Sequence, residues 1–155
     1  MSPPIRKPKD QTALWNGIDQ GLVHVVATDH CPFCMKDQKE LGVDDFRAIP
    51  NGIGGVEHRM DLIYQGVCAG ELTLPRWVEL CSTTPARMFG LYPRKGTIAV
   101  GSDADLVIYD PAYRGKISAK TQQMAVDYSA FEGWEIEGRP TLVTVRGQIQ
   151  VRDGK

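Results

Sequence analysis

The sequence predicts an α/β fold in which one buried strand is followed by helices and then by an antiparallel sheet. Residues 22–27 form a short apolar run rich in β-branched side chains, which is typical of a buried strand. Residues 56–90 carry apolar side chains at helical spacing, whereas residues 96–151 contain short strand-like runs separated by turn residues. With 155 residues, the chain is long enough to bury a core.

Composition excludes several classes of protein. The 18 Lys and Arg residues nearly balance the 19 Asp and Glu residues, so the net charge is −1 and no basic surface for nucleic acid is expected. No apolar stretch approaches the roughly 20 residues that a membrane-spanning helix needs. The four cysteines are too few and too irregularly spaced for the disulfide framework of a secreted protein. We therefore expect a soluble, cytoplasmic protein that binds neither nucleic acid nor membrane.

The first part of the chain is predicted to contain a helix, the strand and a long loop. Residues 10–21 carry three apolar side chains at helical spacing and end in a glycine that can cap a helix. The strand at 22–27 follows at once, as in half of a βα repeat. Residues 34–50 are mixed and charged, so we expect a loop with one helical turn, and residues 50–55 form a glycine-rich turn.

Three helices are predicted next. The first lies within residues 56–70, where apolar side chains recur at i, i+4, i+7 and i+11 and the last residue is glycine. The second follows Thr73 and carries its apolar side chains on one face. The third is expected to start at Thr84, a cap residue followed by proline, and to stop at Gly90.

The final third of the chain is predicted to be part of an antiparallel sheet. Residues 96–109 and 140–151 have the composition of short strands, and Arg146 and Gly147 lie where a tight turn is expected. Residues 111–133 between them are polar and irregular.

Candidate functional residues directly follow the predicted buried strand. Asp29 is a common residue in turns and helix caps, but at the end of a strand it can also be a metal ligand or a general base. Cys31 and Cys34 form a C-x-x-C pair, which could be a redox dithiol, half of a zinc site, or two ordinary thiols on a loop. Because α/β proteins keep their chemistry at the carboxyl ends of strands, this stretch is the favoured location for a site.

The remaining polar motifs give weaker indications. His24 lies within the apolar strand, so we expect a hydrogen-bonded core histidine, whereas His58 has charged neighbours and is expected on a solvated face. His30 is isolated in the sequence. The glycines at 52–55 lack both the dinucleotide spacing and the Lys-Ser/Thr pair of a phosphate-binding loop.

Taken together, three segments resemble the C-terminal portion of the cyclic amidohydrolases, in the branch of the hydantoinases and dihydropyrimidinases. They are ATDHCPF, DDFRAIPNGIGGVEHRMDLIYQGV and STTPARMFGLYPRKGTIAVGSDADLVIYDP. The resemblance extends from Met1 to Gly147, which is nearly the whole chain. Its segments SPP, TDH and IPNG are those that would take part in the chemistry.

This resemblance implies a fold and a reaction. Enzymes of this branch are (β/α)8 TIM barrels with two divalent metal ions, for which zinc is the expectation, and with a small β-sandwich built from both chain ends. They hydrolyse the ring amide of hydantoins or dihydropyrimidines to N-carbamoyl amino acids, a step of pyrimidine catabolism. Residues 1–91 would then be the last barrel strand with its helices and active-site loops, and residues 92–155 the C-terminal contribution to the sandwich and a tail.

The same resemblance assigns roles to three residues. Asp29 corresponds to the aspartate at the end of the last barrel strand, which is both a metal ligand and the catalytic group that carries a proton from the attacking hydroxide to the leaving ring nitrogen. Ser2 and Asn51 correspond to positions that bind the ring amide of the substrate, largely through backbone groups.

Length indicates that the barrel is incomplete. A (β/α)8 barrel alone needs about 250 residues, whereas this chain has 155. The other expected metal ligands, an H-x-H pair, a carboxylated lysine and two further histidines, have no counterpart in it. We therefore expect the C-terminal fragment of a longer enzyme, which the resemblance implies is a homotetramer. The fragment should be inactive and prone to aggregate when separated from the N-terminal part of the barrel.

Two other functions remain open. The collapsin response mediator proteins are non-catalytic assembly proteins with the same architecture, but that branch tends to carry an acidic residue at the position of Asn51. A thiol oxidoreductase that uses Cys31 and Cys34 would need a thioredoxin-like sheet, which the long helical middle of the chain does not supply.

Overall fold

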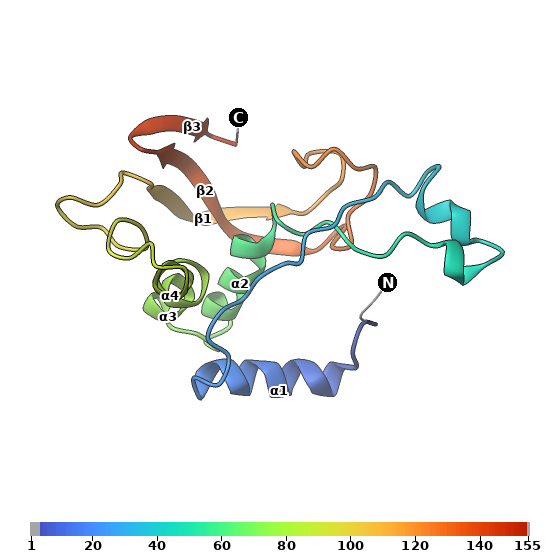
Figure 1. Ribbon diagram of the computed structural model, residues 1–155, viewed down its shortest axis with the longest axis horizontal. Helices are drawn as coiled ribbons and strands as arrows, with labels where there is room; N and C mark the ends of the chain where they lie inside the picture. Colours follow the sequence, from blue (N-terminus) through green and yellow to red (C-terminus); the bar gives the residue numbers. More distant parts are fainter. Residues whose placement is uncertain (1–3, 155) are drawn as a thin grey trace.

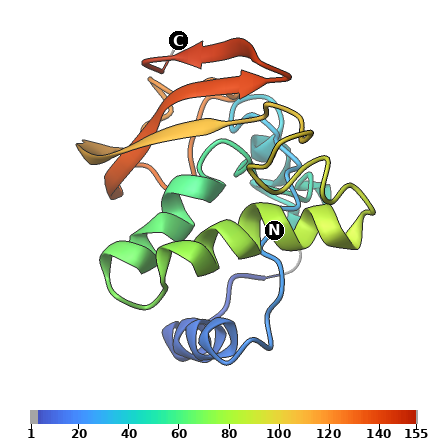
Figure 2. The same cartoon turned by 90° about the vertical axis from the view of Figure 1, so that its left-hand side faces the viewer.

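A computed structural model describes residues 4–154. Its elements, in chain order, are α1 (Pro8–Asp19), the 3-10 helices η1 (Lys39–Gly42) and η2 (Phe46–Ala48), α2 (Arg59–Cys68), α3 (Leu74–Val78), the π-helical turn η3 (Glu79–Thr83), α4 (Thr84–Met88), β1 (Val107–Lys116), β2 (Glu135–Val145) and β3 (Gln148–Arg152). Helices α2 to α4 form a middle layer between the sheet and α1 (Figures 1 and 2). Among the described residues, no helix is long and apolar enough to cross a membrane.

Helix α1 forms where the sequence predicts it. Pro8 opens the helix, and the Lys7 N–H donates to Asp10 Oδ2 at 3.0 Å, which satisfies a backbone donor near the helix start. The helix ends just before Gly21, as expected. Its inner face carries Ile18 into the core.

The predicted buried strand at 22–27 is extended, but it does not belong to a sheet, so this prediction is wrong in part. A strand needs a neighbour for its backbone groups, and in the described part of the chain none runs beside this segment. Two helices hold it instead: Arg76 Nη2 donates to the Val23 carbonyl and Arg59 Nη1 to the Val26 carbonyl, each at 2.9 Å. Its side chains are half-buried or exposed.

The predicted second and third helices form one continuous helix. Helix α2 lies within the predicted range 56–70, and α3 begins after Thr73, whose Oγ1 accepts a hydrogen bond from the Arg76 N–H at 3.3 Å. Thr84 is not a cap, because its backbone is helical (φ −65°, ψ −45°) and the chain passes from α3 through η3 into α4. Pro85 lacks an N–H and its ring would crowd the preceding turn of an α-helix, and the wider π-helical turn accommodates it.

The antiparallel sheet is confirmed, in the order β1-β2-β3, but its first strand starts later than predicted. Residues 96–106 are turns and irregular chain. An ion pair between Lys95 Nζ and Asp103 Oδ2 at 2.9 Å helps to close this stretch into a loop. The β2–β3 hairpin turns at Arg146 and Gly147, whose φ values of 51° and 79° are the left-handed pair that a two-residue hairpin favours.

The core lies between the helices and the sheet. Its buried side chains are Ile18, Tyr64, Leu72, Trp77, Leu80 and Cys81. The rings of Tyr64, Trp77 and Tyr109 pack with centroid separations of 4.7–5.1 Å, and they come from α2, α3 and β1. This aromatic cluster therefore fixes the helices to the sheet.

Candidate functional site

The extended segment after α1 ends at Asp29, whose carboxylate is accessible. Asp29 has a φ of 46°, in the left-handed region that residues other than glycine rarely adopt. Aspartate is among the residues that tolerate this conformation, so the chain can turn sharply here while the side chain stays exposed. A carboxylate presented in this way is available to a cation or a substrate.

His30 joins the end of this segment to the glycine-rich turn. Its backbone forms a parallel bridge with Ile53, and the Cys31 N–H donates to the Ile53 carbonyl at 3.1 Å. The His30 ring adds two further links, because its Nδ1 accepts hydrogen bonds from the N–H groups of Gly55 at 3.1 Å and Val56 at 3.3 Å. Since Nδ1 accepts, the N–H of the ring is on Nε2.

These links place the predicted substrate-binding residue Asn51 beside the Asp29 segment. The Asn51 carbonyl accepts a hydrogen bond from the Cys31 thiol, with 3.6 Å between Sγ and O, and the Asn51 side chain is exposed. Gly52 has a φ of 120°, and a Cβ on it would lie 2.5 Å from the Cys31 carbonyl oxygen, so this close approach requires glycine. The TDH and IPNG segments thus meet. Ser2, the third predicted site residue, lies outside the described residues.

Lys39, which no sequence pattern indicated, lies against the same turn. Its Nζ donates to the carbonyls of Pro50 and Gly52, the second at 2.8 Å. The same Nζ lies 5.2 Å from the centroid of the Phe33 ring. Because its partners are backbone carbonyls, which every residue carries, spacing of residue types could not reveal this contact.

The C-x-x-C pair does not have the surroundings of a redox dithiol. Cys31 and Cys34 are both free thiols. A redox pair of this kind has a helix starting at its first cysteine, which favours the thiolate. Here the chain from 31 to 38 is irregular or turn, the next helix starts only at Lys39, and the Cys31 thiol contacts a carbonyl. The arrangement favours two ordinary thiols on a loop.

Two predictions about histidines are wrong. His24 is exposed, because in the described part of the chain no strand covers its side of the extended segment. His58 is buried, with 7% of its surface exposed, and its ring packs edge-on against Phe131 with 6.5 Å between centroids. The loop that carries Phe131 is far from His58 in the sequence, so the charged neighbours of His58 could not predict that this loop buries its ring.

The described chain does not contain a complete metal centre. Among residues 4–154, no three His, Cys, Asp or Glu side chains gather closely enough to hold an ion. Asp29 offers a hard oxygen ligand of the kind that divalent cations accept, but one carboxylate leaves most of a coordination sphere unfilled. Residues 4–154 could therefore supply one ligand of a metal site, but not all of its ligands.

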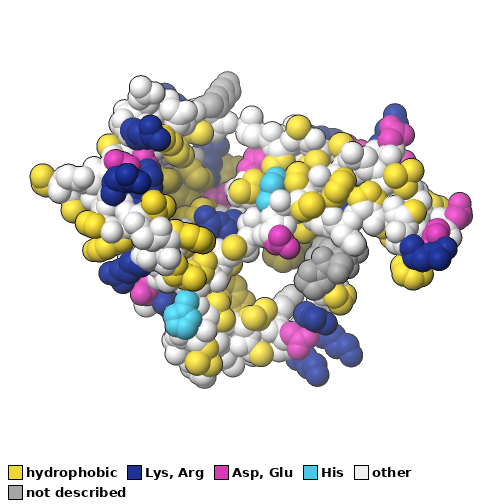
Figure 3. Space-filling model, viewed as in Figure 1, with side chains coloured by type: hydrophobic (Ala, Val, Ile, Leu, Met, Phe, Trp, Pro, Cys, Tyr) yellow, Lys and Arg dark blue, Asp and Glu magenta, His cyan; other side chains and the backbone are white. Residues whose placement is uncertain are grey.

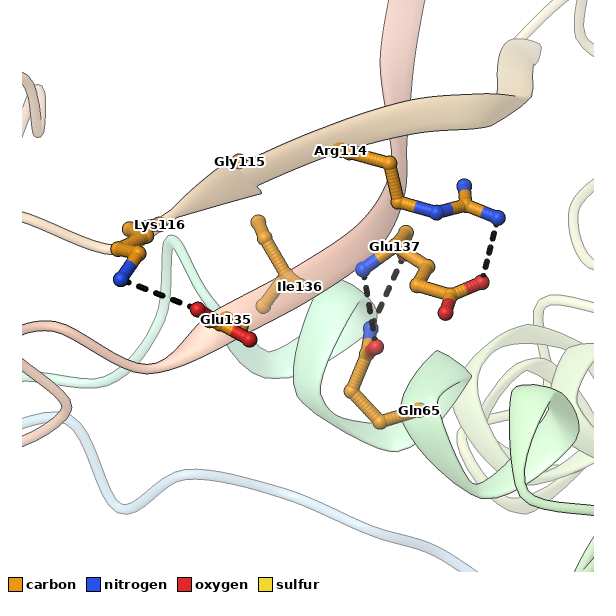
Figure 4. Close-up of a pocket in the computed structure, with 7 residues that line it drawn as sticks. All are labelled: Gln65, Arg114, Gly115, Lys116, Glu135, Ile136 and Glu137. Carbon is orange, nitrogen blue, oxygen red and sulfur yellow. Dashed lines mark hydrogen bonds and ion pairs between the residues drawn. The ribbon is translucent and has the colours of Figure 1, made fainter.

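A cavity of about 470 Å³ lies elsewhere, between α2 and the sheet (Figure 4). Its charged groups pair with one another, Arg114 with Glu137 at 2.8 Å and Lys116 with Glu135 at 3.0 Å. The Gln65 amide exchanges two hydrogen bonds of 3.0 Å with the backbone of Glu137. Since these charged and amide groups already pair with one another, we interpret them as contacts that connect α2 to the sheet rather than as a candidate active site.

Comparison with known proteins identifies the family. The amidohydrolase family matches residues 5–150. The D-hydantoinase of Streptomyces coelicolor is 56% identical over 152 residues, which cover 98% of this chain and 32% of that protein. A solved D-hydantoinase (dihydropyrimidinase) from Thermus sp. is 57% identical with a TM-score of 0.96, and the match covers 100% of this chain and 34% of that one. An L-hydantoinase (dihydropyrimidinase) from Arthrobacter aurescens is 36% identical with a TM-score of 0.92 over the same shares.

The chain spans about a third of the length of the curated relatives that it matches. These matches confirm the predicted resemblance to the hydantoinases and dihydropyrimidinases. They also confirm the predicted fold class, an α/β fragment of a TIM-barrel hydrolase. By its sequence and its fold, the chain belongs to the amidohydrolase family.

Proposed function

We propose that this chain is the C-terminal part of a metal-dependent cyclic amidohydrolase that hydrolyses the ring amide of hydantoins or dihydropyrimidines to N-carbamoyl amino acids. The observation that carries this proposal is the junction at His30, which brings the Asp29 segment against the Asn51 turn. A ring-opening hydrolase needs a proton-carrying carboxylate next to groups that orient an amide. Relatives named D-hydantoinase and D-phenylhydantoinase support the enzyme over the non-catalytic assembly proteins.

Asp29 has two roles in this proposal. It is one ligand of a site for two divalent metal ions, zinc in our proposal, whose other ligands come from the rest of the barrel. Metal ions at such a site lower the pKa of bound water and polarise the carbonyl under attack. Asp29 accepts the proton of the attacking hydroxide and delivers it to the ring nitrogen as the C–N bond breaks, so the nitrogen leaves as a neutral group.

Asn51 and Ser2 bind the substrate in this proposal. A cyclic amide presents one N–H and one C=O in a fixed plane, and the backbone offers the complementary acceptor and donor. A site built to pair with the ring N–H rejects an analogue that lacks it, because a buried backbone group would lose its partner. Selectivity for a cyclic amide over the corresponding lactone is the expected result.

We also propose how the two parts of this chain and the whole enzyme are organised. Residues 1–91 provide the last barrel strand with its helices and loops, and residues 92–155 add strands to the small β-sandwich. The whole enzyme is a cytoplasmic homotetramer that acts in pyrimidine catabolism. The many large apolar side chains exposed on this chain, such as Phe46 and Ile98, support further partners in the assembly.

The test replaces Asp29 in the full-length enzyme. Asp29→Asn keeps the size of the side chain but removes its proton-carrying group, so kcat for hydantoin and dihydrouracil should fall by about 100-fold or more. Formation of the N-carbamoyl product is the measurement. Asp153→Asn is the matched control, since Asp153 is also exposed and has a φ of 52°, and it should leave kcat unchanged.

Two outcomes would refute the proposal. One is a wild-type full-length enzyme that opens neither ring. The other is an Asp29→Asn enzyme that keeps more than a tenth of the wild-type kcat, because a group essential for proton transfer cannot be lost at so small a cost.

A further inference from the structure

The ammonium group of Lys39 holds the backbone on both sides of Asn51. Its Nζ donates to the carbonyls of Pro50 and Gly52, which are the two sequence neighbours of Asn51. The Lys39 side chain is half-buried, and its contact with the Phe33 ring adds a cation–π attraction. One side chain therefore fixes the direction of two peptide groups that flank a single residue.

The backbone of Asn51 itself is held by a different residue. Its carbonyl accepts the hydrogen bond from the Cys31 thiol. In the described part of the chain, no acceptor is hydrogen-bonded to the Asn51 N–H. The turn is thus held by Lys39 and by Cys31, and no acceptor among residues 4–154 occupies the Asn51 N–H.

The turn needs such support because its own sequence is permissive. Three of the four residues 52–55 are glycines, which restrict the backbone little. Lys39 belongs to η1, outside the turn, and in the portion of the chain that is described it forms no ion pair with a carboxylate. Its charge is directed at carbonyl dipoles rather than at a surface ion pair.

We propose that Lys39 is a positioning residue for substrate binding, which holds the Asn51 backbone where it meets the ring amide. This inference rests on the proposed function, because it requires that Asn51 contacts the substrate. Lys39 does not touch the reacting atoms. Without its ammonium group, two carbonyls lose their donor and the turn samples other conformations, so substrate binding weakens while the proton transfer by Asp29 is preserved.

The kinetic test uses the full-length enzyme. Lys39→Met keeps the length and the apolar contact of the side chain but removes its donors, so KM for hydantoin should rise about tenfold while kcat changes less than about threefold. Lys39→Arg restores donors that can span two carbonyls, and its KM should return to within about threefold of wild type. Lys36→Met is the matched control, because the exposed Lys36 lies in the same loop, and it should leave both constants unchanged.

Hydrogen exchange supplies a readout that does not depend on activity. In Lys39→Met, amide exchange in residues 51–56 should be about tenfold faster, while exchange in α2 should match wild type. If the wild-type enzyme opens no ring, the proposed function fails, and exchange still tests whether Lys39 holds the turn.

Three results would overturn the inference. The first is unchanged amide exchange in residues 51–56, whatever the kinetics show. The second is faster exchange throughout the molecule with a lower melting temperature, which would make Lys39 a general stabilising residue. The third is an active Lys39→Met enzyme with wild-type KM, because the turn would then be held without consequence for the substrate.

Discussion

At the scale of single residues, the candidate site depends on a few hydrogen bonds to the backbone and on the close approach of Gly52 to Cys31. The Asn51 turn approaches Cys31 because Gly52 has no side chain in between. His30 and Lys39 then hold the same turn from two further directions, one with an imidazole acceptor and one with an ammonium donor. Most of these contacts end on backbone atoms, so the site is built from the path of the chain more than from its side chains.

Gly52→Ala tests this closeness. The added Cβ would lie 2.5 Å from the Cys31 carbonyl oxygen at a φ of 120°, so the turn must move away from Cys31. In the full-length enzyme we expect kcat/KM for hydantoin to fall by about 100-fold, as for other small misplacements of substrate-binding groups. Gly54→Ala is the control in the same turn, because its Cβ would meet Met124 Sδ at an ordinary 3.5 Å. Equal losses in both variants would contradict the argument.

Some of the residues in the candidate site can be predicted from the sequence and others cannot. Asp29 and Asn51 could be predicted as site residues because they lie in motifs whose resemblance to a family is specific, and their roles stay predictions. Lys39 could not, since the carbonyls that it binds have no sequence signature. The predictions for His24 and His58 failed for a similar reason, because the burial of a side chain depends on segments that are distant in the sequence. The loop that carries Phe131 covers His58, and no described strand covers His24.

At the scale of elements, α2 is joined to the sheet by polar groups as well as by the aromatic cluster. Gln65 pairs with the backbone of Glu137 as a neighbouring strand would. Asp61 accepts a hydrogen bond from the Tyr109 hydroxyl at 3.0 Å. Burial raises the pKa of the Asp61 carboxyl above its usual range, although the hydrogen bond from Tyr109 and the charge of His58 act against this rise.

The raised pKa of Asp61 predicts a pH-dependent effect of Asp61→Asn. A carboxyl whose folded pKa lies above its unfolded value stabilises the fold below the unfolded pKa, and this contribution is lost as pH rises through the folded pKa. Asparagine resembles the protonated form at every pH. The full-length Asp61→Asn enzyme should therefore melt at a higher temperature than wild type at neutral pH and at the same temperature near pH ~3.

The control for this prediction is Asp19→Asn, since Asp19 is exposed on α1 and its carboxylate makes no hydrogen bond within the described structure. Its melting temperature should follow wild type at both pH values. If Asp61→Asn melts below wild type at neutral pH, the hydrogen bond from Tyr109 outweighs the cost of burial and the expected sign is wrong.

Elements were predicted well where their ends are set locally. The glycines after α1 and α2, the threonine before α3 and the turn between β2 and β3 all lie where the sequence indicated. The strand at 22–27 failed because pairing depends on a distant neighbour rather than on β propensity. The helix start at Thr84 failed because a proline that usually begins a helix was instead accommodated inside one.

At the scale of the whole molecule, much apolar surface is uncovered. A groove of about 360 Å³ between α1 and the extended segment is lined mainly by apolar side chains, including Leu14, Val23 and Val25. Hydrophobic side chains also reach the surface over much of the face in Figure 3. Phe46 is 81% exposed and Ile98 is 88% exposed. Surface of this kind usually marks contact with other protein segments.

The isolated 155-residue chain is therefore expected to self-associate and to lack activity. Light scattering after size-exclusion chromatography should show species larger than a monomer, a hydrophobic dye should bind, and no stoichiometric metal should be retained. The full-length enzyme is the control and should show none of the dye binding. A monomer with one sharp melting transition would contradict this expectation.

The π-helical turn η3 has a consequence for the register of the long helix. Cys81 and Ala86 are both buried although they are five residues apart, a spacing that separates two side chains by about 140° around an uninterrupted α-helix. The wider turn absorbs one residue and returns both to the same face. Removing one residue from η3 would leave a regular α-helix with its buried face intact. In its geometry, η3 is thus equivalent to an α-helix with one residue inserted.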